Sequence, residues 1–495
     1  MLENNEQEIC ELFLQLEEKN ELFEKLEVNN IKIWHYIRYE IYNLILQILG
    51  IFKNPNLDKV YYKKQDTIKD WIDKEILKNQ FNIKHKEVFI LNHQRRIKQG
   101  DYYKCNYTDE WLKKFNRSYY VFELQHADNF HFKPVKTKNL RYIDQVQFMK
   151  IFHKKYCTES VCHKESKKVA DYLIKILENA FEIVFGVKEK KKIMQIIVHK
   201  VTARDGLKDY YGYLLKRIKP KIIIYVVGTG FDQMILGETG RELGIPTVEI
   251  QHGHIGRGHL GYNFNCDVCL NSFPEYLFVT GQHEVEAIRP PIPKENIYIT
   301  GSPELDFKVN YYKKKLQNRK KLKKIITFIS GGEREIVDAA IEMYQKLDKD
   351  QYKIYLKLHP SEYTSWRKKY CKLENSGVCV VDGSLHDIYY YLAISDYLVG
   401  VASAVLFEAT RFECDIMVLK TGRYFNAESL INTGNGVYIS STEEAIKRIH
   451  SMSSKRTTSD FYHRRNSCQL IYRAIDAILD KKGEEQKSEN VYGTE

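Results

Sequence analysis

Two short, widely separated stretches decide the fold: Val248-Glu249-Ile250-Gln251-His252-Gly253-His254 and Tyr355-Leu356-Lys357-Leu358-His359-Pro360. Each is an apolar, β-rich run that stops at a histidine followed by glycine or proline. In an open parallel sheet, ligands bind just beyond the carboxyl ends of the strands. The two stretches therefore predict two α/β units whose strand ends meet at a polar cleft.

The size and composition of the chain agree with two such units. Its 495 residues are too many for one core, and 43% of them are hydrophobic, with 36 Tyr and 23 Phe. No run of about 18 apolar residues occurs, and the acidic N-terminal stretch lacks the apolar segment of a signal peptide. The ten cysteines are scattered, which is typical of reduced thiols. We therefore expect a globular cytoplasmic protein.

The net charge of +12 predicts attraction to polyanions, among them nucleic acid, anionic lipid headgroups and nucleotide diphosphates. The excess lies in short clusters such as Lys190-Lys191-Lys192 and Lys313-Lys314-Lys315, which solvated helix faces also explain. No RNA-recognition, zinc-finger or helix-turn-helix signature is present, so we expect no nucleic-acid partner.

The hydrophobic pattern divides the chain into five parts. We predict a helical N-terminal extension over 1–80, a first Rossmann-like domain over 81–305, a second over 306–440, terminal helices over 441–480 and a disordered tail over 481–495. The apolar stretch 31–52 fits either a helix packed in the first core or a helix lying on a membrane surface. A Lys-rich stretch from about residue 311 to 324 is the expected hinge.

The periodicity switches to alternating strands and helices after residue 87. The clearest strand is Lys221–Val227, and the following helix, 231–243, is closed by Gly244. In the second half the expected strands are 324–330, 353–358, 378–381, 397–401 and 416–420, and the expected helices are 333–347, 361–371, 385–394 and 403–412. This alternation predicts doubly wound parallel sheets.

Three elements of the second half are candidates for a nucleotide donor. Gly331 and Gly332 form a strand-to-helix turn that lets backbone N–H groups approach a phosphate, and Arg334 follows at the helix start. His359-Pro360 places an imidazole at a strand end, where it can donate to a phosphate or ribose. The alternatives are a purely steric turn, an exposed helix charge and a structural loop histidine.

The third donor element is the segment Ser403-Ala404-Val405-Leu406-Phe407-Glu408. Small residues at a strand-to-helix junction allow close approach of an anion, and Ser403 can cap the helix or bind phosphate. Glu408, further along the helix, is a candidate for ribose hydroxyls. Helix capping alone is the competing interpretation.

The first half supplies the candidate base and acceptor groups. His252 at a strand end can take a proton from an acceptor hydroxyl, with Glu249 and Asp232 as rival carboxylates. The acceptor-side candidates are Arg95, Arg96 and His254, with Arg257 and His259 nearby. Ordinary loop residues and a glycine-rich mobile loop are the alternatives. Cys266 and Cys269 have metal-knuckle spacing, but no second pair follows, so no metal is expected.

Four motifs in order carry a resemblance: Gln251-His252-Gly253, Gly301-Ser302-Pro303-Glu304-Leu305-Asp306, Leu358-His359-Pro360 and the 403–409 helix. Over about residues 220–450 the chain resembles bacterial surface-polysaccharide glycosyltransferases of the GT-B fold, a group that includes capsule, lipopolysaccharide and teichoic-acid enzymes. The resemblance implies donor phosphates held by His359, Ser403 and Ala404, and a ribose held by Glu408. It also implies a catalytic base near His252.

The chain departs from this family in several places. The acidic motif of bacterial sialyltransferases is not evident, Ala402 stands where a hydroxyl residue often precedes Ser403, and no Asp-x-Asp metal motif stands out. Nucleotide-sugar 2-epimerases share the architecture, and a non-catalytic nucleotide-binding scaffold is a further alternative.

The resulting hypothesis is a metal-independent glycosyltransferase without a tightly bound cofactor. It would use a nucleotide-activated sugar, or a related polyol phosphate, as donor and co-substrate. The acceptor would be a glycan or lipid-linked glycan, and the inner membrane surface is a candidate partner.

Overall fold

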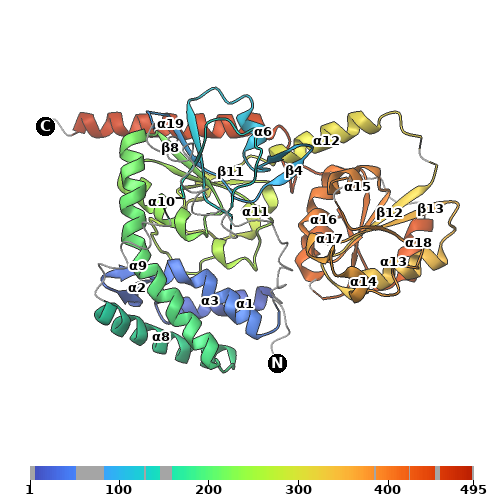
Figure 1. Ribbon diagram of the computed structural model, residues 1–495, viewed down its shortest axis with the longest axis horizontal. Coiled ribbons are helices and arrows are strands. Elements are labelled where there is room, and N and C mark those ends of the chain that lie inside the picture. The colour runs from blue at the N-terminus through green and yellow to red at the C-terminus, as the bar shows by residue number, and fades with distance from the viewer. Residues whose placement is uncertain are drawn as a thin grey trace.

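The computed structural model describes residues 6–51, 83–126, 130–144, 146, 159–320, 322–383, 386–422, 424–451 and 458–492. Two α/β bodies lie side by side, each built on its own parallel sheet (Figure 1). The predicted class, two doubly wound parallel-sheet units, is confirmed. The helices are α1 Glu6–Lys19, α2 Leu22–Lys25, α3 Trp34–Ile48, α6 Asp109–Leu112, α8 Glu159–Phe181, α9 Val187–Ile218, α10 Phe231–Glu242, α11 Gln282–Ala287, α12 Pro303–Leu316, α13 Arg334–Lys346, α14 Trp366–Lys369, α15 Ile388–Ile394, α16 Ala404–Glu408, α17 Glu428–Asn432, α18 Thr442–His450 and α19 Ser467–Tyr492.

The first sheet has seven parallel strands in the order β11-β10-β9-β8-β3-β6-β7. Their bounds are β3 Val88–Leu91, β6 Tyr119–Glu123, β7 Leu140–Tyr142, β8 Ile222–Val226, β9 Thr247–Ile250, β10 Tyr276–Val279 and β11 Ile297–Ile299. The predicted strand at 221–227 is β8, whose five residues are all buried. Strands covered on both faces read as continuous apolar runs, which explains why β8 was the clearest strand in the sequence.

The second sheet has six parallel strands in the order β14-β13-β12-β15-β16-β17. Their bounds are β12 Lys324–Ile329, β13 Tyr352–Lys357, β14 Cys379–Val381, β15 Tyr397–Gly400, β16 Asp415–Leu419 and β17 Val437–Ile439. Three of these strands, β12, β13 and β15, end at the segments that the sequence analysis chose for the donor. Small additional ribbons are β1 Glu27–Val28 with β2 Ile31–Lys32, and β4 Ile97–Gln99 with β5 Tyr102–Lys104.

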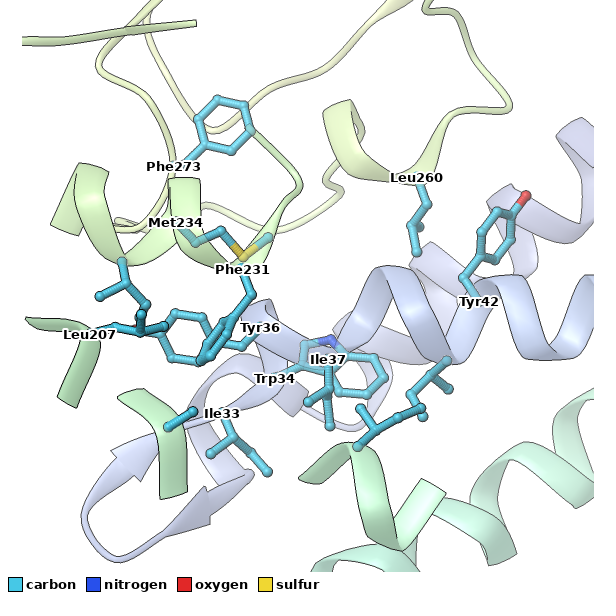
Figure 2. Close-up of a cluster of buried hydrophobic side chains, with 14 of the residues drawn as sticks. Ile33, Trp34, Tyr36, Ile37, Tyr42, Leu207, Phe231, Met234, Leu260 and Phe273 are labelled. Carbon is cyan, nitrogen blue, oxygen red and sulfur yellow. The ribbon is translucent and has the colours of Figure 1, made fainter. Parts of the chain in front are cut away.

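The N-terminal helices are part of the first core. Trp34, Ile37 and Ile41 of α3 are fully buried in one cluster with residues of α9, α10 and the first sheet (Figure 2). For α3 this confirms the core-packed interpretation over the membrane-surface one. Residues 52–82 of the expected extension lie outside the described residues, and the predicted domain boundaries stay predictions.

A buried ion pair fixes α3 to its surroundings. The Arg38 guanidinium donates to both carboxylate oxygens of Glu17 on α1, at 2.6 and 2.7 Å. It also donates to the main-chain oxygens of Leu260 and Asn263, at 2.9 and 3.0 Å. Because these four bonds satisfy the buried charge, α3 holds the loop that follows β9 in one position.

The chain passes between the two bodies twice. The first passage is α12, where Ser302 caps the helix and Pro303 begins it. The second is the segment before α19, whose Ser467 donates through N and Oγ to Asp306 at 2.8 and 2.7 Å. Asp306 also accepts from Arg411 of the second body. The Gly-x-Pro-x-x-Asp motif therefore joins both passages.

Helix α19 returns to the first body and covers a face of its sheet (Figure 1). Ile471, Ala474, Ile475 and Ile478 pack there beside strand residues. The sequence predicts a disordered tail over 481–495, whereas the helix runs on to Tyr492. Residues 311–316 of the expected hinge at 311–324 are also helical, as the end of α12.

The predicted helix over 361–371 is wrong. The structure has a 3₁₀ turn over Pro360–Glu362 and the four-residue α14 instead. The Glu362 carboxylate accepts from Ser330 Oγ and from the His359 N–H, which holds this 3₁₀ turn against the end of β12. None of the helices among the described residues is long and apolar enough to cross a membrane.

Candidate functional site

A cavity of about 100 Å³ lies where the two bodies meet. The first body contributes the loop after β9, with His252 and His254, and the second contributes Ala404 and Glu408 of α16. The remaining lining residues are Asn106, Tyr107, Ile250, Gln251, Gly253, Thr280, Glu284, Gly301, Ser302, Pro303, Phe407 and His463. Four candidates from opposite halves of the sequence thus line one cavity.

His252 has the features of a neutral base. Its Nδ1 is buried and has no hydrogen-bond partner among the described residues. Burial, and then the nearby Arg95 charge, lowers its pKa to about 4. The imidazole is therefore unprotonated near pH 7 and can accept a proton from a bound hydroxyl.

Arg95 supplies positive charge at the same junction. Its side chain is exposed, and its charge also lowers the pKa of His359 in the second body. The guanidinium has neither an ion pair nor a hydrogen bond within the described ranges. It is therefore free to meet an anionic ligand that enters from solvent.

His254 joins the two bodies by ring stacking. Its ring lies 4.1 Å from that of Phe407 of α16 and 5.2 Å from that of His283, with interplanar angles of 13° and 6°. Burial, followed by the charges of neighbouring histidines, lowers the pKa of His254 to about 3. A neutral stack of this kind lets the bodies touch without repulsion between imidazolium ions.

Glu284 of α11 belongs to the site but was not among the predicted residues. It is 2% exposed, its Oε1 accepts from Thr280 and Gln251, and its Oε2 has no partner among the described residues. Burial raises its pKa to about 7. The sequence signal is weaker than for His252, because Glu284 lies five residues beyond β10, in α11, and His252 lies two residues beyond β9. His463, which the second passage brings in, carries no such signal.

Glu408 faces the cavity from the second body. Burial raises its pKa to about 7, and the Tyr389 hydroxyl donates to its Oε1 at 3.4 Å. Ser403 accepts from the Val405 N–H and caps α16, and its expected contact with a phosphate stays a prediction. The capped helix start leaves Ala404 at the cavity wall.

Three predicted residues are held away from this cavity. Glu249 is 1% exposed and accepts from Tyr262 at 2.5 Å, and Asp232 accepts from Tyr211 of α9 at 3.3 Å. The Arg96 side chain is fully buried and donates to Glu123 and Thr137. The expected acceptor role of Arg96 is wrong, because its charge is neutralised inside the first body. Glu249 is likewise enclosed and cannot reach a ligand in the cavity.

The glycine and His-Pro loops form a second group at the ends of β12 and β13. Gly331 donates its N–H to the Glu333 carboxylate at 2.9 Å, and Gly332 adopts a φ of 105°. The Nδ1 of His359 lies 2.7 Å from Ser361 Oγ, and Pro360 begins the 3₁₀ turn. Arg334 is exposed and lies 3.8 Å from Asp338. None of these residues lines the cavity described above.

Among the described residues, no group of three or more His, Cys, Asp or Glu side chains is gathered as a metal ligand set. Cys266 is partly buried and Cys269 is exposed.

Known proteins resemble this chain in structure but not detectably in sequence. No protein-family model matches the sequence, and no curated protein matches it. The UDP-GlcNAc 2-epimerase from Methanocaldococcus jannaschii is similar in structure, with 12% identity, 79% of this chain and 99% of that chain covered, and a TM-score of 0.49.

Two further solved structures are similar at the same level. The UDP-GlcNAc 2-epimerase from Neisseria meningitidis, bound to UDP-GlcNAc, has 12% identity, covers 78% of this chain and 99% of its own, and has a TM-score of 0.45. A variant of the wall teichoic acid polymerase TagF has 11% identity, covers 91% of this chain and 98% of its own, and has a TM-score of 0.45.

Proposed function

We propose that this chain is a glycosyltransferase-type enzyme that acts on a nucleotide-activated donor at the junction of the two bodies. It transfers a sugar, or a polyol phosphate, to a surface-glycan acceptor. The observation that carries the proposal is the shared cavity, in which unpartnered His252 Nδ1 and Glu284 Oε2 of the first body face Glu408 of the second.

The chemistry follows from the protonation states of these groups. Neutral His252 accepts the proton of an acceptor hydroxyl while the hydroxyl oxygen attacks the donor carbon or phosphorus. The bond to the nucleotide phosphate breaks, and the nucleotide leaves with the bonding electrons. In this proposal Arg95 and the main chain at the start of α16 stabilise the departing phosphate charge, and His359 contacts a phosphate of the bound donor.

Glu408 is the proposed contact for donor hydroxyls. A carboxyl accepts hydrogen bonds when ionised and donates one when protonated, and the raised pKa of Glu408 makes both forms accessible near pH 7. Tyr107 lies across the same cavity and offers an aromatic surface to the ligand.

The first experiment measures thermal stabilisation by CMP, CDP, UDP and GDP, with wild type and with Glu408→Gln. Glu335→Gln, at an exposed position of α13, is the matched control. We expect one nucleotide to raise Tm in wild type and in the control, and to raise it less in Glu408→Gln. That nucleotide then identifies the donor for a transfer assay. Absence of stabilisation by all four, together with no turnover of their sugar or polyol derivatives, would remove the proposal.

A 2-epimerase is the second candidate, and one observation favours it. Glu284 and Glu408, both with a pKa raised to about 7, line the same cavity, and epimerisation needs paired groups that remove and return a proton. Incubation with a UDP-N-acetylhexosamine in D₂O without acceptor separates the two functions. Deuterium at C2 of the sugar supports the epimerase, whereas transfer that requires an acceptor supports the proposal above.

A further inference from the structure

A larger cavity, of about 310 Å³, lies between the N-terminal helices, the loop 254–260 and the second body. Sites for small ligands typically measure about 300–1,000 Å³. Its walls include Tyr39, Tyr42 and Asn43 of α3, Arg257 and His259 of the loop, and Asn426 of the second body. The N-terminal helices therefore form one side of a ligand-sized space, a role beyond packing.

The wall made by α3 and the loop is rigid. Arg38 holds the loop through Leu260 and Asn263, and the Asn263 amide in turn donates to the main-chain oxygens of Gly256 and His259 at 2.8 and 2.9 Å. Tyr42 donates to the main-chain oxygen of Gly258 at 3.3 Å. Figure 2 shows Tyr42 and Leu260 on the facing elements. A fixed wall lowers the entropy cost of ligand binding.

The wall carries the groups that recognise carbohydrate. The Tyr39 and His259 rings stack at 5.3 Å and 11°, and His259 Nδ1 is buried without a partner among the described residues. Asn43 and Asn426 contribute amides. Aromatic faces cover the apolar side of a sugar or polyol, while amides and imidazoles pair with its hydroxyls.

Arg257 adds a charge to this wall. It is exposed, and within the described parts of the chain its guanidinium has neither an ion pair nor a hydrogen bond. A guanidinium matches the geometry of phosphate and carboxylate groups. The ligand that fits the wall is therefore a sugar or polyol chain with an anionic group.

The cavity continues along the domain junction. A neighbouring cavity of about 250 Å³ shares Arg257 and Asn426 with it. His254 lines both of these cavities and also the one that contains His252 and Glu408. An extended chain that lies in this groove thus points its end towards His252.

We propose that this groove is the acceptor site, which binds the growing end of an anionic glycan, with Arg257 pairing its phosphate or carboxylate and Tyr39 packing against a sugar or polyol unit. The inference rests on the proposed transfer function. It assigns the N-terminal helices to acceptor recognition and leaves the donor to the cavity at Glu408.

Steady-state kinetics of Arg257→Gln and Asn43→Trp test the assignment, with Arg473→Gln, at an exposed position of α19, as the control. Acceptor probes are an oligomer of glycerol phosphate, an oligosaccharide that carries a carboxylate, and maltotriose as the uncharged reference. We expect Arg257→Gln to raise the acceptor KM about tenfold to a hundredfold for whichever anionic probe is used, the scale of a hydrogen bond to a charged group. Asn43→Trp fills the cavity and abolishes transfer.

Donor hydrolysis by water separates this inference from the proposed function. Both variants are expected to keep the wild-type rate of donor hydrolysis, the nucleotide-induced rise in Tm and the donor KM. Unchanged acceptor kinetics in Arg257→Gln and Asn43→Trp, or an equal effect on maltotriose, would overturn the acceptor assignment while the transfer function stands. Absence of both donor hydrolysis and transfer in wild type would instead contradict the proposed function itself.

Discussion

The two histidine motifs look alike in the sequence, but their surroundings in the structure differ. His252 lines a cavity with an unpartnered Nδ1, and the neighbouring Glu284 has an unpartnered Oε2. His359 bonds to Ser361, and Glu362 accepts from both loops at the ends of β12 and β13. A buried polar atom without a partner costs stability, and a catalytic or binding role is one reason why proteins keep it. The comparison favours a catalytic role for the motif at His252 and a mainly structural role for the motif at His359.

The largest expected effect is on turnover in His252→Asn, which tests the first half of this comparison. Removal of a general base lowers the rate by about 10²–10⁴-fold, while Tm and nucleotide binding stay at wild-type values. His163→Asn, on an exposed face of α8, is the control. Turnover within a factor of two of wild type would exclude His252 as the base.

The second prediction concerns stability at the other motif. Glu362 is 4% exposed and accepts from Ser330, His359 and Tyr370. Glu362→Ala leaves these donors without their partner, so we expect a loss on the order of 3 kcal/mol in the free energy of unfolding, measured by urea denaturation. The exposed Glu335→Ala should change it by less than about 0.5 kcal/mol. Equal stability of the two variants would contradict the architectural role of the second motif.

The third prediction follows from the pKa of Glu284, raised by burial to about 7 in the folded protein. A carboxyl with a raised folded pKa stabilises the protein below its unfolded pKa of about 4.5, and this stability is lost as pH rises through 7. Glu284→Gln removes the effect. We therefore expect the Tm of the variant, relative to wild type, to rise between pH 5 and pH 8.

The difference between the two Tm curves is the quantity to measure in that experiment. His254 lies 3.9 Å from Glu284, and its lowered pKa gives the opposite dependence, with stability lost as pH falls below about 6.5. Subtraction cancels this histidine contribution. A difference that is flat or that falls with pH would show that the Glu284 carboxyl is ionised in the folded protein.

The smallest expected effect is in His359→Ala. Its exposed ring can still meet a donor phosphate through Nε2, so we expect nucleotide binding to weaken about threefold to tenfold, as for one hydrogen bond. The kcat at saturating donor should stay near the wild-type value. A loss of kcat as large as that of His252→Asn would erase the proposed difference between the motifs.

Much of the fold could be predicted because the deciding signals are local. Apolar runs such as Ile222–Val226 mark buried strands, and the polar residue that ends each run lies at the sheet edge where ligands bind. This rule predicts His252 and His254, whereas Ala404 and Glu408 are predicted from the small residues at the start of the following helix. The same rule, applied to the strand ending at Val279, points to Thr280, and Glu284 lies four residues beyond it in α11.

The remaining errors come from partners that are distant in sequence. In the sequence Arg96 has the features of a ligand-binding loop residue, but in the structure Glu123 neutralises its charge. Glu249 is enclosed by Tyr262. His463 reaches the cavity because the chain returns from the second body, and no local pattern encodes that return. The N-terminal helices were described as an extension, since nothing in their periodicity shows what they pack against.

The return of α19 to the first sheet has a consequence for biosynthesis. Ile471, Ile475 and Ile478 cover a face of that sheet, but the ribosome makes them after the entire second body. During translation, that face of the first sheet therefore stays partly uncovered until the second body has been made, although domains generally fold as they emerge. Synthesis of the second body thus sets the interval during which this apolar surface is exposed to aggregation.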